Sequence, residues 1–121
     1  MGKNLAFGKW GENRAASFLE EKGIEIIGRN IRTAYGEIDL VGRVQNTCIF
    51  FEVKTRSTNK FGMPEDAVTK LKLNHIFQSA QSFLVEHPEM GEDWRIDVIA
   101  IQKTDSHSAP IITWFENVSV E

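Results

Sequence analysis

The sequence contains little cysteine and no long hydrophobic run. It has 121 residues, and its single cysteine, Cys48, cannot form an internal disulfide. This excludes a disulfide-stapled scaffold and favours a reducing compartment. No apolar stretch approaches the roughly 20 residues of a membrane span, and the first ten residues lack the continuous apolar core of a signal peptide. We therefore expect a cytoplasmic protein with no membrane partner.

An excess of positive charge is also absent, because the formal net charge is -3. Proteins that bind nucleic acids non-specifically usually carry a basic surface, so this balance argues against strong non-specific binding. It leaves local or metal-assisted contacts with phosphates open. With 41% hydrophobic residues and only three prolines, the composition predicts one domain, residues 1–121, around one hydrophobic core.

Hydrophobic spacing predicts two helices and five strands. The helices are expected at about residues 7–22, ended by Gly23, and at 65–87, ended by Pro88. The strands are expected at residues 24–32, as two strands within 37–56, and at 95–103 and 111–118. The apolar stripe of the second helix is expected to contain Val68, Leu71, Ile76, Ala80, Phe83 and Leu84. This order predicts an α/β or α+β fold with a mixed sheet.

Residues 37–56, EIDLVGRVQNTCIFFEVKTR, predict a hairpin that gathers acidic side chains on one face. With Gln45-Asn46 as the turn, Asp39 lies opposite Glu52 and Glu37 lies opposite Lys54; a turn at Asn46-Thr47 or a longer loop is the alternative. The opposite face carries the apolar residues Ile38, Leu40, Val44, Ile49, Phe51 and Val53. A slip of one residue would push Glu52 and Lys54 into this apolar layer, so the pattern itself predicts the register.

Crowded carboxylates of this kind need an explanation. Two of them about 4 Å apart repel by roughly 4 kcal/mol at an effective dielectric near 20, and Lys54 can offset only one charge. Such a cluster sits in open water, takes up a proton or binds a cation, and its oxygens suit Mg²⁺ or Mn²⁺. Glu12 shares a helical stripe with apolar residues, so we expect it to face inward as a further member. Asp39, Glu52 and Lys54 therefore predict metal-dependent phosphodiester hydrolysis.

Several fragments in order carry a family resemblance. They read G-K-W-G-E-N-R-A-A-S-F-L, R-N-I-R, G-E-I-D-L-V-G, F-F-E-V-K-T-R, F-G-M-P-E-D-A-V with Lys72 beyond it, and R-I-D-V-I. Over about residues 7–102 the chain resembles the bacterial YraN-like family. That family is grouped with the restriction-endonuclease-like, PD-(D/E)xK nuclease superfamily and is akin to archaeal Holliday-junction resolvases. Two departures are visible: Ile38 replaces the motif's proline, and residues 73–75 stand where relatives are often basic.

The resemblance implies a restriction-endonuclease-like α-β-β-β-α-β core with a mixed central sheet flanked by helices. It implies that Asp39, Glu52 and Lys54 are catalytic, that Glu12 is an additional acidic ligand of the metal, and that Lys72 contacts a phosphate. From the residues, Arg56 is the first candidate for a further substrate contact, within a basic rim that includes Lys60 and Lys70. Asp97 is expected to have a structural role, paired with Arg95 or with a strand neighbour, and Cys48 is not expected to be a nucleophile.

Three functional hypotheses follow from these features. The leading one is a Mg²⁺- or Mn²⁺-dependent endonuclease acting on DNA, with branched or damaged DNA suggested by kinship alone. The second is a nucleic-acid-binding module that keeps the fold without catalysis. The third is a structural interaction protein whose acidic face docks a basic surface. Resolvases often act as dimers, so a homodimer is an open expectation, although no hydrophobic seam in the sequence requires one.

Overall fold

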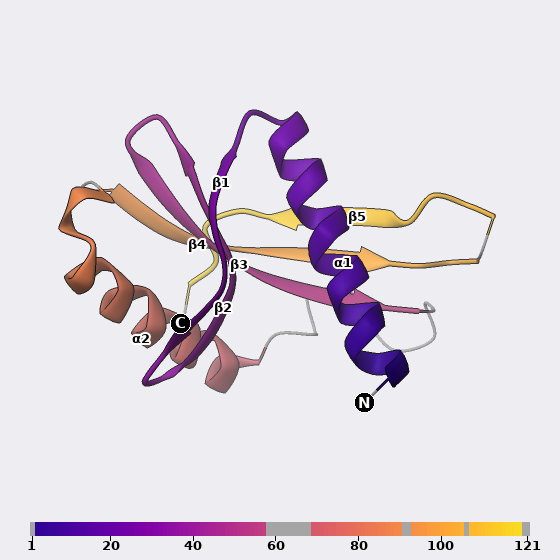
Figure 1. Cartoon of the computed structure of the whole chain (residues 1–121), viewed down its shortest axis with the longest axis horizontal. Helices are drawn as coiled ribbons and strands as arrows, with labels where there is room; N and C mark the ends of the chain where they lie inside the picture. The colour runs from indigo at the N-terminus through magenta and orange to yellow at the C-terminus, as the bar shows by residue number, and fades with distance from the viewer. Residues whose placement is uncertain (1, 58–68, 91–92, 106, 120–121) are drawn as a thin grey trace.

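A computed structural model describes residues 2–57, 69–90, 93–105 and 107–119, with side chains from residue 5 onward. The described elements are α1 (Gly2–Glu21), β1 (Glu25–Thr33), β2 (Gly36–Val44), β3 (Thr47–Arg56), α2 (Lys70–Glu86), the 3-10 turn η2 (Pro88–Met90), β4 (Asp93–Gln102) and β5 (Ile111–Phe115). Their order confirms the predicted α-β-β-β-α-β core, to which β5 is added (Figure 1).

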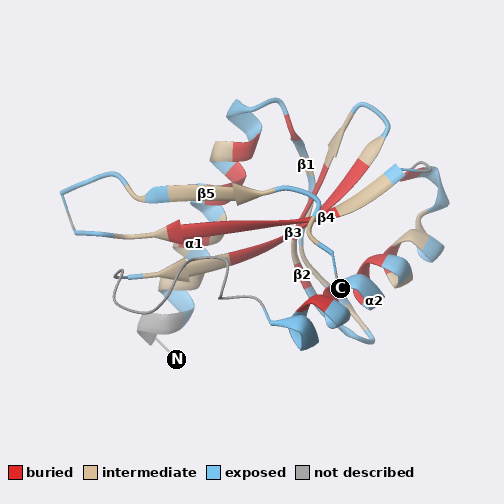
Figure 2. Ribbon diagram, turned by 180° about the vertical axis from the view of Figure 1, so that it is seen from behind, coloured by how far each residue is buried: buried red, intermediate tan, exposed pale blue. Residues whose placement is uncertain are grey.

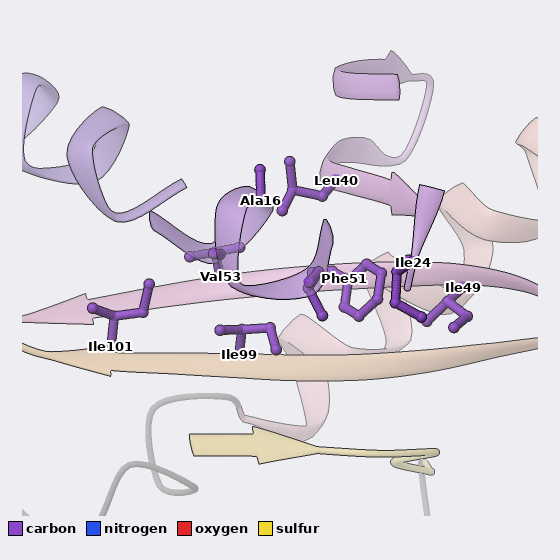
Figure 3. Packing of buried hydrophobic residues seen from close by; sticks show 10 residues of the cluster. Ala16, Ile24, Leu40, Ile49, Phe51, Val53, Ile99 and Ile101 are labelled. Atoms are coloured by element: carbon purple, nitrogen blue, oxygen red, sulfur yellow. The ribbon is translucent and has the colours of Figure 1, made fainter. Parts of the chain in front are cut away.

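The sheet has five strands in the order β1-β2-β3-β4-β5 and lies between the two helices. β3 and β4 run parallel, and the other neighbouring strands are antiparallel. The core therefore has two layers of side chains. On one face Leu40, Phe51 and Ile99 pack with Ala16 and Leu19 of α1 (Figure 3). On the other face β-strand residues pack with the buried side of α2, and the central strands are buried along most of their length (Figure 2).

Helix α1 ends where the sequence predicts, at a glycine. Gly23 has a φ of 92°, which a residue without a Cβ adopts easily. Its N–H donates to the carbonyl of Glu20, and the N–H of Ile24 donates to the carbonyl of Leu19, both at 3.0 Å. This pair of bonds is the Schellman arrangement. It turns the chain so that Ile24 enters the core beside Leu19, and β1 follows directly.

A second glycine sets how closely α1 approaches the sheet. Gly11 is buried, and a methyl group at this position would collide with the side-chain hydroxyl of Thr55 on β3. The missing side chain thus lets the helix backbone lie against the end of β3. The next residue, Glu12, is carried to the same end of the sheet.

The β2–β3 hairpin confirms the predicted turn and part of the predicted register. Val44 pairs with Thr47 across Gln45-Asn46, and regular pairing continues to Leu40 and Phe51. The expected opposition of Asp39 with Glu52, and of Glu37 with Lys54, does not form as a ladder in the described strands. Instead, the carboxylate of Asp39 accepts a hydrogen bond from the N–H of Val53 at 2.8 Å. The N–H of Val53 thus bonds to a side-chain carboxylate of β2 instead of a main-chain carbonyl, at the point where β2 and β3 begin to separate.

The predicted face of Ile38 is wrong. Ile38 is buried with Val41 and Phe50 on the α2 side of the sheet, whereas Leu40 packs on the α1 side. Strict alternation along β2 would have placed Ile38 and Leu40 together. This change of face lies across from an irregular residue of the neighbouring strand, because Asn30 of β1 has a left-handed φ of 49° between the pairs Arg29–Leu40 and Ile31–Ile38.

Helix α2 differs from its prediction at its start and in one face residue. Thr69 is the N-cap, and its side chain accepts from the N–H of Lys72; Val68 lies outside the described residues. Leu71 was expected in the core but is 67% exposed, while Leu73 is buried. The stripe that faces the sheet begins at Leu73 and continues through Ile76 and Phe83, which leaves Leu71 on the outer side. The end before Pro88 is as predicted.

Neither described helix combines the length and the hydropathy needed to cross a lipid bilayer.

The corrected stripe of α2 predicts unequal effects for two similar substitutions. Leu73→Ala should lower the free energy of unfolding by about 2–4 kcal/mol, because it leaves a cavity against the sheet. Leu71→Ala, two residues earlier in the same helix, should change it by less than about 0.5 kcal/mol. Urea denaturation followed by circular dichroism measures both. Equal losses for the two variants would contradict the assigned face of α2.

Candidate active site

Charged side chains converge where β2 separates from β3. Figure 1 shows that the tip of the β1–β2 hairpin lies near α2, while β3 and β4 continue beneath α1. Asp39 comes from β2, Glu52 and Lys54 come from β3, and Lys72 comes from the first turn of α2. We call these four residues the carboxylate–lysine cluster. The separation of the strands makes room for side chains that a continuous ladder would have kept apart.

Glu52 is the buried centre of this cluster. Its side chain is 4% exposed, and its Oε2 lies 3.5 Å from the Nζ of Lys72 and 3.8 Å from the Nζ of Lys54. Burial raises the pKa of Glu52, because removing a carboxylate from water disfavours its charged form; the two lysines act in the opposite direction. Two cations from different elements therefore share one carboxylate oxygen.

Asp39 is the second carboxyl group of the cluster. Burial, followed by the charge of Glu52, raises the pKa of Asp39 to about 7, although the hydrogen bond from Val53 opposes this rise. Glu12 raises the pKa further and Lys72 lowers it. A hydrogen bond between the two carboxyl groups lowers the pKa of Glu52, so the groups are in direct contact. The pair is therefore arranged to hold a proton near neutral pH.

Glu12 faces inward, as predicted, but its direct partner is a residue that the sequence analysis missed. Its side chain is 17% exposed, and the Nδ2 of Asn30 donates to its Oε1 at 3.1 Å and to its Oε2 at 3.2 Å. The same Nδ2 lies 3.4 Å from the Oε1 of Glu37, and the Nζ of Lys9 donates to the Oδ1 of Asn30 at 3.0 Å. An asparagine inside a predicted strand was the available signal, since asparagine is depleted from strands.

This group borders open space. A cavity of about 550 Å³ lies beside α1 and is lined by Leu5, Ala6, Gly8, Lys9, Glu12, Asn30 and Glu37. A ligand that enters this cavity meets Glu12 and the amide of Asn30 directly. Glu37, for its part, lies 3.9 Å from Arg32, its neighbour across the β1–β2 ladder.

The other predicted residues lie further from the cluster or outside the described chain. Arg56 is half-buried at the end of β3, where it pairs with Gln102 of β4, and Lys60 is not among the described residues. Asp97 is fully buried and accepts hydrogen bonds from Arg95 and from the indole N–H of Trp114, which confirms its predicted pairing with Arg95. Burial raises the pKa of the Cys48 thiol to about 11, so it is not an activated nucleophile.

The expected ligand set of Asp39, Glu52 and Glu12 is not assembled as one group. Among the described residues, no three histidine, cysteine, aspartate or glutamate side chains are arranged to hold a metal ion. Asp39 and Glu52 come together with both lysines, whereas Glu12 stands beside them in contact with Asn30. Two adjacent carboxylates remain, which is a donor set that Mg²⁺ accepts when water completes its coordination.

Comparisons with known proteins agree on one family. The family model described as uncharacterised protein family UPF0102 matches residues 11–101. A UPF0102 protein of Chloroherpeton thalassium is 44% identical over 101 residues, which cover 84% of this chain and 78% of the relative. One from Beutenbergia cavernae is 43% identical over 106 residues, 88% of this chain and 90% of the relative. One from Nocardia farcinica is 41% identical over 112 residues, which cover 93% of this chain and 87% of the relative. These descriptions state no reaction.

The raised pKa of Asp39 predicts a specific dependence of stability on pH. Between the ordinary value of 3.8 and about 7, the folded chain holds a proton that the unfolded chain has released. This group therefore makes the folded state less stable as pH rises through that window. Asp39→Asn should remove this loss and raise stability at pH 8 by up to about 4 kcal/mol, since one pKa unit corresponds to about 1.4 kcal/mol.

Denaturation in urea at pH values from 4 to 8, with a chelator present, measures this effect. Asp93→Asn is the matched control because Asp93 is an exposed carboxylate at the start of β4. Parallel stability curves for wild type and Asp39→Asn would show that Asp39 has an ordinary pKa.

Proposed function

This chain belongs to the uncharacterised protein family UPF0102, and from its carboxylate–lysine cluster we propose that it is a Mg²⁺- or Mn²⁺-dependent endonuclease that hydrolyses phosphodiester bonds of DNA. Membership of the family agrees with the resemblance to YraN-like proteins. The family description assigns no chemistry, so the argument for a reaction comes from the side chains.

One observation carries the proposal: two carboxyl groups from neighbouring strands meet beside two lysines at a gap in the sheet. Glu52 is buried and Asp39 is partly buried, and burial raises the pKa of both carboxyl groups. Their negative charges are therefore stable together only when a proton or a cation binds between them. Hard carboxylate oxygens with some access to water are the ligands that Mg²⁺ and Mn²⁺ take in enzymes that act on phosphates. The residues present therefore fit a divalent cation held by Asp39 and Glu52.

A cation bound there would stabilise charge on a phosphoryl oxygen and make an adjacent water more acidic. The chain's own residues have separate tasks. The hydrogen bond from the N–H of Val53 fixes the orientation of the Asp39 carboxylate. The side chain of Lys54 is 34% exposed, so its ammonium group can turn toward a phosphate while it stays near Glu52. Lys72, which is 45% exposed, can contact a second phosphate oxygen.

The order of the elements supports the same proposal. Asp39 on one strand, followed by Glu52 and Lys54 on the next, is the spacing of the PD-(D/E)xK motif, and these strands stand within an α-β-β-β-α-β core. We therefore propose that the chain has a restriction-endonuclease-like fold, with Ile38 in place of the motif's proline. DNA as the substrate, and branched DNA in particular, rests on that kinship.

A non-catalytic nucleic-acid-binding module is the second candidate, and two observations favour it. Glu52 already has two lysines within 4 Å, which partly neutralise the charge that would attract a cation. Among the described residues no three-ligand metal group is preassembled. In that case Lys54 and Lys72 would contact phosphates without hydrolysis. The two candidates differ in what Mn²⁺ does to the protein and in whether DNA is cut.

Binding of Mn²⁺ should stabilise wild type and not Asp39→Asn. At a free concentration of 100 times Kd the gain is about 2.7 kcal/mol. The gain should be larger at pH 8 than at pH 6, because the cation must displace the proton held by the carboxyl pair. Thermal melting with and without Mn²⁺ at both pH values tests this, with Asp93→Asn as the control that keeps the response. Absence of any Mn²⁺ effect on wild type would contradict the metal site.

Cleavage should depend on Lys54. Wild type with Mg²⁺ or Mn²⁺ is expected to cut at least one of four labelled DNAs: a single strand, a duplex, a flap and a four-way junction. Lys54→Met should reduce the rate by about 10²–10³-fold, the usual effect of removing one group that stabilises transition-state charge. Lys22→Met is the matched control, because Lys22 lies over the ring of Phe18 near the far end of α1. No cutting by wild type, or equal cutting by Lys54→Met, would refute the enzyme and favour the binding module.

A further inference from the structure

We propose that Asn30 is a positioning residue that holds the Glu12 carboxylate beside the carboxylate–lysine cluster, so that Glu12 takes part in binding the divalent cation. This inference rests on the proposed metal-dependent function and extends it to a residue with no chemistry of its own. Asn30 on β1 donates hydrogen bonds to both carboxylate oxygens of Glu12 on α1. No other described side chain bonds to both of these oxygens.

The backbone of Asn30 is unusual for a strand. Its φ of 49° lies in the left-handed region, although the pairs on both sides of it, Arg29–Leu40 and Ile31–Ile38, are regular. Asparagine tolerates this conformation better than most residues with a Cβ. The strand therefore bends at one residue, directly across from Asp39. The distorted position and the acid site coincide, which is typical of a residue held for its side chain.

The side chain of Asn30 uses both ends of its amide. Its Nδ2 donates to both oxygens of Glu12 and lies near one oxygen of Glu37, while its Oδ1 accepts from the ammonium of Lys9. The reversed amide would place Oδ1 against three carboxylate oxygens and Nδ2 against a cation, so these partners determine its orientation. Four polar contacts, three from α1 and one from β2, thus hold one amide in place.

A neutral amide suits this task better than a cation would. Lysine or arginine at position 30 would neutralise Glu12, whereas an amide fixes the carboxylate and leaves its negative charge. Lys9 lies 3.7 Å from Glu12 but is 57% exposed, so water screens its charge. The Glu12 carboxylate is only 17% exposed, so water screens it less than it screens Lys9. Holding a glutamate in one rotamer before the ligand arrives also avoids the entropy cost of ordering that side chain on binding.

The position of the held carboxylate relative to open space completes the argument. Glu12, Asn30, Glu37 and Lys9 line the cavity of about 550 Å³ beside α1. The Glu12 carboxylate therefore borders a space that a ligand can enter, and it is held there by Asn30, the residue across the ladder from Asp39. Groups that orient a metal ligand in this way typically change metal affinity by 10–100-fold when removed.

The test measures Mn²⁺ affinity of the full chain by isothermal titration for four proteins: wild type, Asn30→Gly, Glu12→Gln and the double variant. Glycine accepts the left-handed backbone, so Asn30→Gly removes only the amide. We expect Asn30→Gly and Glu12→Gln each to weaken Mn²⁺ binding by about 10-fold. The double variant should bind no more weakly than Glu12→Gln alone, because Asn30 acts through Glu12.

Asn13→Ala is the matched control. Asn13 accepts a hydrogen bond from Arg29 at 2.7 Å, so its loss removes another contact between α1 and β1 without touching Glu12. Its Mn²⁺ affinity should equal that of wild type. If Asn30→Gly does not fold, the side-chain amide resonances of Asn30 provide the second measurement. Mg²⁺ should shift them in wild type and not in Glu12→Gln, and an unresponsive amide in wild type would overturn the inference.

The outcomes separate the two proposals. If wild type binds no Mn²⁺, the metal site and the role of Asn30 are both refuted. If wild type binds Mn²⁺ but Asn30→Gly binds it equally well, only the role of Asn30 is refuted. The same holds if the effects of Asn30→Gly and Glu12→Gln multiply in the double variant, or if Asn13→Ala weakens binding as much as Asn30→Gly does.

Discussion

The burial of Glu52 is the constraint on which the rest of the site depends. A carboxylate that is 4% exposed cannot remain charged in a protein interior without compensation. The chain supplies Lys54 from the same strand and Lys72 from the first turn of α2. It also places Asp39 in contact with Glu52. Repulsion between the two carboxylates destabilises the charged pair, and the same repulsion favours the binding of a proton or a cation. A fold selected only for stability would have no reason to add this second acid.

Helices on opposite faces of the sheet both reach the site, α1 through Glu12 near its middle and α2 through Lys72 in its first turn. Gly11 lets α1 lie against the end of β3, which brings Glu12 close to Asp39. Thr69 caps α2, so the helix begins just before Lys72. Side chains from both faces can meet only where the sheet is open, which is the gap between β2 and β3. The break in the ladder is therefore a structural requirement of the site.

Local rules predicted the elements that depend on local chemistry. Gly23 ends α1, Gln45-Asn46 forms the hairpin turn, and the register follows as far as Leu40 and Phe51. The errors share one cause, which is contact between distant segments. Ile38 packs with residues of α2 such as Ile76 instead of with Leu40. Leu71 is exposed because α2 turns Leu73, not Leu71, toward the sheet. Asn30 could not be selected because its partners, Lys9, Glu12 and Glu37, are brought to it only by the fold.

β1 forms one border of the sheet, and its irregular course makes that border a poor template for other chains. Its register with β2 shifts between Ile26 and Gly28, and the backbone then takes a left-handed turn at Asn30. A strand from another molecule would need a straight row of free amides and carbonyls to pair with this border. The register shift and the left-handed residue interrupt that row twice within the nine residues of β1. The opposite border, β5, is only five residues long. The distortion that shapes the acid site thus also protects against edge-to-edge aggregation.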